Sequence, residues 1–400
     1  MNQPLLERLR APGPKRILSL DGGGIRGCAS LGFLERIETI VRERTRNPDA
    51  VLSDYFDLIG GTSTGAIIAA MLSLGHPVSY VTKKYLELGP EVFSVRSFWA
   101  RIPWIGPKLF TAWSVRPLEK FAKEVFLEKT TLGSPAIRTG LCVVTKRADT
   151  FSTWPYINHP GAKYYKHNAD TALWKLVRAS SAAPTYFRPM RLDVGTPESQ
   201  QFGTFIDGGV SMANNPALQL FLVATLGGFP FHWKTGADDL LIVSVGTGRW
   251  RMSLQDAEIV TPWNLHWAHN VPELLMQDAT HQNELLLQYL SRSPTAREID
   301  REVGTLEHDL LGGAERLTYL RYNAELSEDA LSEHGIPFEP KQLASWRDMA
   351  AGKNARVLYE IGQTFAKNDV KTEHFPAVFD GAPTTIPPAP VPVVGSSATA

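Results

Sequence analysis

The chain has 400 residues, in which 41 basic side chains balance 41 acidic ones and hydrophobic residues make up 43% of the total. This composition is typical of a globular protein with a substantial core and excludes a disordered or coiled-coil chain, and the zero net charge gives no reason to expect a nucleic-acid polymer as partner. The two cysteines, Cys28 and Cys142, belong to no Cys-x-x-Cys pair or Cys/His cluster, so neither a disulfide framework nor a metal site is predicted.

A polar leader, residues 1–16, precedes the first predicted element. It lacks the apolar core of a signal peptide, and the longest apolar stretches further on, such as 218–226, are too short to span a bilayer. We therefore expect a cytoplasmic protein whose contact with a membrane, at its inner face, is peripheral.

The first predicted elements are a strand, a glycine loop and a helix. Residues 17–20 form a short apolar strand, glycines 22–24 follow it directly, and apolar side chains then recur at helical spacing over 28–46. The same order returns with a strand at 55–59 and, after a glycine turn, a helix at 66–74. Further strands are predicted at 140–145, 204–206, 240–245 and 316–322.

This alternation of strands and helices predicts an α/β fold, in which a mostly parallel central sheet lies between two layers of helices. Beyond residue 261 the pattern is mainly helical, most clearly at 272–290 and 341–365. We therefore divide the chain into an α/β domain, residues 17–218, and an appended, mainly helical extension packed on it, residues 219–376. The last stretch, 377–400, is rich in Pro, Ala, Ser and Thr, which predicts a disordered tail.

A Gly-x-Ser-x-Gly motif lies between the second predicted strand and its helix, with Gly61 and Gly65 on either side of Ser63. This is the context of a nucleophile elbow, in which a strained turn exposes the serine hydroxyl above the edge of the sheet. The glycines leave room for the turn, and the following helix directs its N-terminal dipole at Ser63. A plain glycine-rich turn is the alternative, because so short a motif also arises by chance.

The loop after the first strand reads Asp21-Gly22-Gly23-Gly24-Ile25-Arg26-Gly27. Successive backbone N–H groups of such a loop converge on an anion at the start of a helix, and in acyl transfer that anion is the oxyanion of the tetrahedral intermediate. We assign Gly22, Gly23, Gly24 and Arg26 to this oxyanion hole, and we expect Arg26 either to hold the loop or to contact a phosphate head group.

The same loop also spells Gly-x-Gly-x-x-Gly from Gly22 to Gly27, so a non-catalytic nucleotide-binding module is a competing interpretation. A dinucleotide site needs an acidic residue at the end of its second strand, about twenty residues further on. The region around Glu43 still has a helical pattern, which weakens this alternative.

A third motif, Asp207-Gly208-Gly209, follows the predicted strand at 204–206. It places a carboxylate at a strand end beside two flexible residues, although a simple turn aspartate has the same local sequence. A Ser-Asp-His triad would need a histidine after Asp207, but none lies in a recognisable loop after a strand. The histidines available are His232, His266, His269, His281, His308, His334 and His374.

The three motifs, in this order, resemble those of the patatin-like phospholipase family. The family pattern is a glycine-rich oxyanion loop, a Gly-x-Ser-x-Gly elbow and an Asp-Gly-Gly or Asp-Gly-Ala aspartate, and this chain matches it without a substitution. Residues 179–187 are similar to a small-residue and proline segment that lies near the active site of the family. The resemblance covers residues 17–218 and implies a three-layer α/β/α sandwich.

The resemblance also implies a mechanism. Ser63 attacks the ester carbonyl, Asp207 accepts its proton, and the amides of Gly23 and Gly24 hold the oxyanion, without histidine, metal or cofactor. The implied activity is that of a phospholipase A or lysophospholipase acting on membrane lipid esters. Acyl transfer to an alcohol or a lysolipid on the same dyad remains an alternative.

Two further regions bear on partners. Residues 98–113 interleave aromatic and aliphatic side chains with basic ones, which predicts either an interfacial lid on a bilayer or a cap over the core.

Bacterial members of the family often carry a Ser-Val-Gly-Thr-Gly stretch, found here at 244–248, and a helical C-terminal region. Some of those members are antiviral effectors switched on by a cyclic nucleotide, so an activator site within 261–375 is a further expectation. Head group, acyl preference and oligomeric state have no signal in the sequence.

Overall fold

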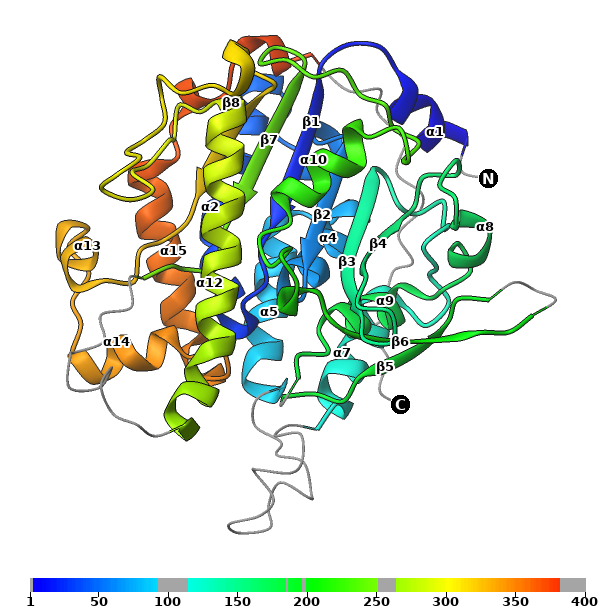
Figure 1. Cartoon of the computed structure of the whole chain (residues 1–400), viewed down its shortest axis with the longest axis horizontal. Coiled ribbons are helices and arrows are strands. Elements are labelled where there is room, and N and C mark those ends of the chain that lie inside the picture. The colour runs from blue at the N-terminus through cyan, green and yellow to red at the C-terminus, as the bar shows by residue number, and fades with distance from the viewer. Residues whose placement is uncertain (1–2, 93–113, 185, 196–198, 251–263, 382–400) are drawn as a thin grey trace, which may run out of the picture.

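The computed structural model describes residues 3–92, 114–184, 186–195, 199–250 and 264–381 (Figure 1). Within these residues the strands are β1 Lys15–Leu20, β2 Leu58–Thr62, β3 Gly140–Arg147, β4 Thr153–Ile157, β5 Met190–Asp193, β6 Phe202–Asp207, β7 Leu240–Val245, β8 Ser291–Arg292 and β9 Leu317–Tyr322. The α-helices are α1 Gln3–Arg10, α2 Gly27–Thr45, α3 Leu52–Tyr55, α4 Thr64–Ser73, α5 Val78–Val92, α7 Arg116–Phe126, α8 Tyr165–Asn168, α9 Leu173–Ser180, α10 Ala217–Thr225, α12 Asn264–Leu290, α13 Glu328–Glu333, α14 Pro340–Arg347 and α15 Ala355–Asp369.

The described strands form a single mixed sheet in the order β5-β6-β3-β2-β1-β7-β9-β8, with β4 paired to β3 outside this path. From β3 to β8 every neighbouring pair on the path is parallel. The antiparallel strands, β4, β5 and β6, lie at the β3 side. The predicted fold class, a mostly parallel central sheet between helices, is confirmed.

Helices cover both faces of this sheet (Figure 1). The central strand β1 is buried along its whole length, and its apolar side chains alternate between two cores because successive side chains of a strand point to opposite faces. Leu18 and Leu20 pack in the core that contains α2, α4, α5 and α15. Ile17 packs in the core on the other face, with α1, α10 and α12.

The parallel strands at the centre end side by side. Leu20 at the end of β1 is in register with Gly61 of β2 and with Val245 of β7. The loops that follow these strands therefore meet at one edge of the sheet, where ligands of open α/β sheets bind.

The C-terminal region, residues 219–376, is mainly helical, but it also completes the sheet with β7, β8 and β9. Its last long helix, α15, packs directly on α2. A Cβ added to Gly32 would lie 2.3 Å from the backbone N of Gln363, and one added to Gly362 would lie 2.1 Å from the carbonyl O of Ala29. These two glycines let the helix backbones touch, so the C-terminal region shares the core of the α/β domain.

Several predicted boundaries are corrected by the structure, among them the polar leader 1–16, which contains helix α1 and the first two residues of β1. The helix predicted at 341–365 is two helices, α14 and α15, separated by a short non-α-helical segment. Residues 377–381, assigned to the disordered tail, are packed: Phe379 is 1% exposed, the Arg44 guanidinium donates to both carboxylate oxygens of Asp380, and Arg16 Nη1 donates to the carbonyl of Gly381 at 2.7 Å.

The rest of that tail and the aromatic segment 98–113 lie outside the described residues. Among the helices that the structure does describe, none combines the length and apolar character needed to cross a bilayer.

Candidate active site

Ser63 occupies a strained turn between β2 and α4. Its backbone has φ 54° and ψ −121°, a left-handed conformation that is uncommon for a residue with a side chain. The flanking glycines make the turn possible, because a Cβ on Gly61 would lie 2.2 Å from the carbonyl of Gly65, and a Cβ on Gly65 would lie 2.1 Å from the carbonyl O of Leu20. The geometry is that of the nucleophile elbow predicted from the motif.

The hydroxyl of Ser63 donates a hydrogen bond of 2.6 Å to Oδ2 of Asp207. Asp207 is the last residue of β6 and pairs with Thr145 of β3, which lies next to β2 in the sheet. The other carboxylate oxygen, Oδ1, accepts the N–H of Gly209 at 2.7 Å. The structure therefore brings together the two residues predicted as a dyad, although 144 positions separate them in the sequence.

The carboxyl group of Asp207 is only 5% exposed, and this burial raises its pKa to about 6. The hydrogen bonds from Ser63 and Gly209 oppose the rise but do not cancel it. A carboxylate with a pKa close to neutrality is a better proton acceptor than an exposed aspartate and is still mostly ionised at pH 7.

A second serine, Ser180, holds the elbow in place. Its hydroxyl accepts the backbone N–H of Ser63 at 2.8 Å and donates to the carbonyl of Val144 at 2.6 Å. Ser180 ends α9 and lies in the small-residue segment 179–187, of which residue 185 is not described. The resemblance placed this segment near the site, but nothing in the residue pattern showed that Ser180 contacts the nucleophile.

The glycine loop presents two amides without an acceptor. The N–H groups of Gly23 and Gly24 donate to no acceptor within the described residues, whereas the N–H of Gly22 donates to the carbonyl of Asn214 at 3.0 Å. The N–H of Gly22, predicted as an oxyanion donor, is thus already hydrogen-bonded. Its role is steric, because a Cβ there would lie 2.6 Å from Oδ1 of Asn214 and 3.4 Å from Cβ of Ser63.

Side chains could not replace the two glycines with free amides. A Cβ on Gly23 would lie 2.2 Å from the hydroxyl oxygen of Thr247. Gly24 has φ +58°, and a Cβ there would lie 2.4 Å from the carbonyl O of Met349. The loop is closely packed on both sides, so its amides keep fixed directions.

Arg26, predicted to belong to the oxyanion hole, contacts backbone carbonyls and so braces the glycine loop. Its side chain is buried, with Nε 3.5 Å from the carbonyl of Gly23 and Nη1 donating to the carbonyl of Arg347 at 3.3 Å. The guanidinium also lies 4.7 Å from the ring centre of Trp250. Of the two roles expected for Arg26, these contacts support holding the loop.

Asp21 begins the glycine loop and is anchored by an arginine 300 residues away. Arg321 of β9 donates Nη1 and Nη2 to the two carboxylate oxygens of Asp21 at 2.9 and 2.6 Å, and Nε to Glu284 of α12 at 2.9 Å. All three side chains are at most 4% exposed. Sequence reasoning did not find this network.

Other glycines of the predicted motifs lie where two segments of the chain approach too closely for a side chain to fit. A Cβ on Gly27 would lie 2.1 Å from Cγ2 of Thr64, and a Cβ on Gly208 would lie 2.6 Å from the carbonyl O of Val144. Helix α2 continues to Thr45, so Glu43 is helical and does not end a second strand. The ribose contact required by the nucleotide-binding alternative is therefore missing.

Comparison with known proteins places this arrangement in a family. The sequence model described as Patatin-like phospholipase matches residues 18–221, a range that holds the glycine loop, the elbow and Asp207. The chain belongs to the patatin-like phospholipase family. The family consists of serine esterases that hydrolyse lipid acyl esters.

Patatins are similar to the chain beyond this domain. Patatin-17 of Solanum cardiophyllum is 30% identical over 246 residues, 58% of this chain and 60% of that protein, so the match spans less than two thirds of Patatin-17. Patatin-1-Kuras 2 of Solanum tuberosum is 26% identical over 372 residues, 90% of this chain and 88% of that protein. The crystal structure of VipD from Legionella pneumophila is similar over 88% of this chain and 67% of that chain, with 13% identity and a TM-score of 0.34.

In this patatin-like phospholipase a polar cavity of about 270 Å³ adjoins the glycine loop. Its wall is formed by residues at the ends of β1, β7 and β9 and by the described part of α12. Asn214 and Thr247, which contact Gly22 of the loop, line the cavity together with Arg249.

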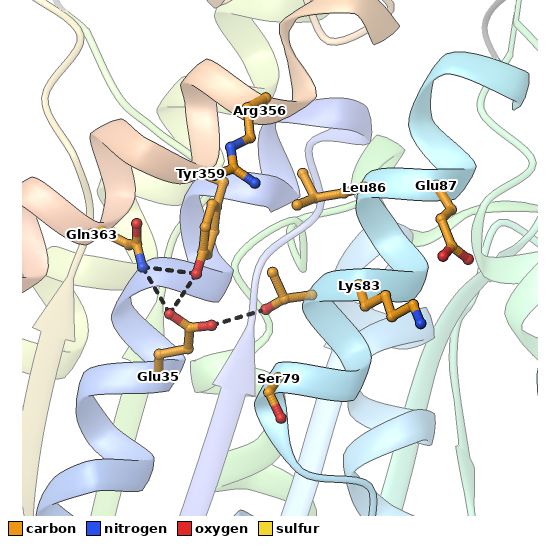
Figure 2. Close-up of a pocket in the computed structure, with 9 residues that line it drawn as sticks. Glu35, Ser79, Lys83, Leu86, Glu87, Arg356, Tyr359 and Gln363 are labelled. Atoms are coloured by element: carbon orange, nitrogen blue, oxygen red, sulfur yellow. Dashed lines mark hydrogen bonds between the residues drawn. The ribbon is translucent and has the colours of Figure 1, made fainter.

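A larger hollow, of about 570 Å³, lies between α2, α5 and α15 and contains neither Ser63 nor Asp207 (Figure 2). The carboxylate of Glu35 accepts the hydroxyl of Tyr359 at 2.7 Å, Nε2 of Gln363 at 3.0 Å and the hydroxyl of Thr82 at 3.4 Å. These contacts join the three helices and leave Glu35 well bonded.

Proposed function

We propose that the protein is a lipid acyl hydrolase of the phospholipase A or lysophospholipase type, which cleaves carboxylic esters of membrane lipids with Ser63 as nucleophile and Asp207 as base. The observation that carries this proposal is the 2.6 Å hydrogen bond from a strained serine to a buried carboxylate at the edge of the sheet. Membership of the patatin-like phospholipase family supports the choice of substrate class.

The reaction follows from this geometry. Oδ2 of Asp207 takes the hydroxyl proton of Ser63 while Oγ attacks the ester carbonyl, and the amides of Gly23 and Gly24 stabilise the oxyanion. Asp207 returns the proton to the departing alcohol, which leaves an acyl group on Ser63. Water then attacks the acyl-enzyme, Asp207 accepts its proton, and fatty acid is released as Ser63 regains a proton.

The test is the release of free fatty acid and lysolipid from mixed phospholipid vesicles, followed by mass spectrometry. Acyl transfer on the same dyad would appear instead as a new ester when glycerol or a lysolipid is added, because the acceptor replaces water in the second step. An excess of transfer product over free fatty acid would make the protein a transacylase. The absence of both products, with and without added cyclic dinucleotides, would contradict the proposed function.

We further propose that a cyclic nucleotide activates the enzyme, as in antiviral defence. This activation is supported by contacts between the C-terminal region and the glycine loop: the carbonyl of Met349 accepts the N–H of Ile25 at 2.9 Å, and Arg321 holds Asp21. A ligand that shifts this region would therefore move the oxyanion donors. Lipid hydrolysis that stays unchanged across a panel of cyclic dinucleotides would contradict the activation.

We expect the pH dependence of hydrolysis to report Asp207. Because only its carboxylate form accepts the proton of Ser63, kcat/KM should rise with pH, roughly tenfold per unit below pH 6, and level off above it. The measurement is kcat/KM for an uncharged soluble ester from pH 4.5 to 8. A midpoint near pH 4 would show that Asp207 is not the group whose ionisation limits the rate.

Replacing Gly24 with alanine should lower kcat by roughly 100- to 1,000-fold, the effect of losing one oxyanion donor. The added Cβ meets the carbonyl of Met349 and needs a left-handed backbone, so the amide turns away from the oxyanion. Gly228→Ala is the matched control, because a Cβ there meets nothing within 4 Å. If both variants keep the kcat of the parent protein, the loop does not supply the oxyanion hole.

A further inference from the structure

The polar cavity beside the glycine loop lies one residue, Gly22, away from the nucleophile. Gly22 separates the two: a Cβ on Gly22 would touch both Oδ1 of Asn214, which lines the cavity, and Cβ of Ser63. Thr247, another wall residue, donates its hydroxyl to the carbonyl of Gly22 at 2.8 Å. A lipid whose ester carbonyl lies at Ser63 therefore has the cavity within reach of its neighbouring groups.

The cavity wall includes the partly exposed guanidinium of Arg249. Arg249 follows β7 and pairs through Nη2 with Glu325 at 2.6 Å, while its side chain remains 33% exposed. No second side-chain acceptor engages this guanidinium among the described residues. Burial lowers the pKa of Arg249, and the nearby Arg297 lowers it further against the opposing effect of Glu325, so an added anion would be stabilised here.

The wall also carries a carboxylate that belongs to none of the described ion pairs. Asp278 of α12 lines the same cavity, and within the described part of the chain it has no ion-pair partner within 4.0 Å. The other carboxylates of the wall are already bound to arginines: Asp21 and Glu284 to Arg321, and Glu325 to Arg249. The cavity therefore presents a guanidinium and a separate unpaired carboxylate.

We propose that this cavity binds the zwitterionic head group of a phospholipid substrate, with the phosphodiester at Arg249 and the ammonium group at Asp278. The inference rests on the proposed lipid hydrolase activity and names its substrate class. A guanidinium presents a planar fork of donors that matches phosphate oxygens, and a carboxylate accepts the N–H groups of an ammonium. An anionic head group would leave Asp278 unpaired, and a neutral glyceride would contact neither Asp278 nor Arg249 through a charged group.

The kinetic test compares kcat/KM for phosphatidylethanolamine, phosphatidylglycerol and diacylglycerol that carry the same acyl chains in mixed micelles. Arg249→Gln should lower the ratio of phosphatidylethanolamine to diacylglycerol about 10- to 100-fold, and Arg249→Lys should restore part of it. Asp278→Asn, at an exposed position, should lower the ratio of phosphatidylethanolamine to phosphatidylglycerol about tenfold. Arg292→Gln, in a surface ion pair, is the control and should keep both ratios. Ratios that do not change in the Arg249 and Asp278 variants would overturn the proposal.

A binding test separates this proposal from the catalytic one. Soluble sn-glycero-3-phosphoethanolamine should raise the Tm of the full chain, and Arg249→Gln should abolish the shift. An equal shift with inorganic phosphate alone would identify a plain anion site and overturn the zwitterionic assignment. A protein that shows the specific shift but cleaves no ester would contradict only the proposed function. One that cleaves lipids with neither the shift nor the ratio changes would contradict only the head-group site.

Discussion

Replacing Asp207 with asparagine is expected to lower kcat by about 10³- to 10⁴-fold. Asparagine has nearly the same shape and keeps an oxygen that can accept the N–H of Gly209, but its amide cannot take the proton of Ser63. Ser63→Ala removes the nucleophile and should leave only background hydrolysis. Because the two residues act as a unit, the double variant should be no slower than Ser63→Ala alone. The measurement is kcat on phospholipid vesicles and on a soluble ester.

The control for this prediction is Asp238→Asn. Asp238 carries an exposed carboxylate that pairs with Arg292 on the surface, so its neutralisation should leave kcat within about twofold. Loss of activity in Ser63→Ala but not in Asp207→Asn would place the base elsewhere in the chain. Equal fatty acid release by all variants would remove both residues from the mechanism.

The sequence predicts the parts of this site that depend on local chemistry. The strand β7 has the predicted bounds, and the apolar runs and glycines around Ser63 specify a strand, a turn and a helix in the space of fifteen residues or so. Asp207 also follows from local signals, since a strand followed by Asp-Gly-Gly leaves a carboxylate at a sheet edge. The sequence does not show that the strand ends carrying Ser63 and Asp207 lie side by side, because this depends on the order of the strands in the sheet.

The parts that the sequence did not reveal depend on contacts between distant residues. Ser180 contacts the N–H of Ser63 across 117 positions, and Arg321 contacts Asp21 across 300. Serine and arginine have no pattern of neighbours that identifies such a partner. The occupied amide of Gly22 has the same cause, because its acceptor, the carbonyl of Asn214, comes from a distant part of the chain, just after β6.

The sequence pattern misplaced element boundaries where helix capping or specific packing contacts, and not apolar periodicity, determine the local structure. Tyr55, predicted to begin the second strand, ends the short helix α3, whose first turn is closed by a hydrogen bond from the N–H of Val51 to Oδ2 of Asp54 at 3.1 Å. The composition of 377–400 favours disorder throughout, yet Arg44 and Arg16 bind its first residues. The amino-acid composition of a whole segment does not reveal that two arginines elsewhere in the chain bind its first residues.

Replacing Arg321 with methionine is expected to destabilise the protein by about 3 to 5 kcal/mol. Burial alone lowers the pKa of Arg321, but Asp21 and Glu284 raise it above its usual value, so the guanidinium stays charged between two buried carboxylates. The variant leaves both carboxylates without their shared partner. Arg321 also donates to the hydroxyl of Ser244 at 2.8 Å, so β1, β7, β9 and α12 all lose a contact. The free energy of unfolding is measured by urea titration.

A double-mutant cycle identifies the source of this cost. Glu284 keeps its ion pair with Arg297, so adding Asp21→Asn to Arg321→Met removes the charge that has lost its partner, and the double variant should be less destabilised than the sum of the two single variants. Arg292→Met, which breaks a surface pair, should change the free energy of unfolding by no more than about 0.5 kcal/mol. If Arg321→Met costs no more than Arg292→Met, the buried network does not hold the protein together. The position of the glycine loop would then depend on Thr247, Met349 and Asn214, which bind its backbone directly.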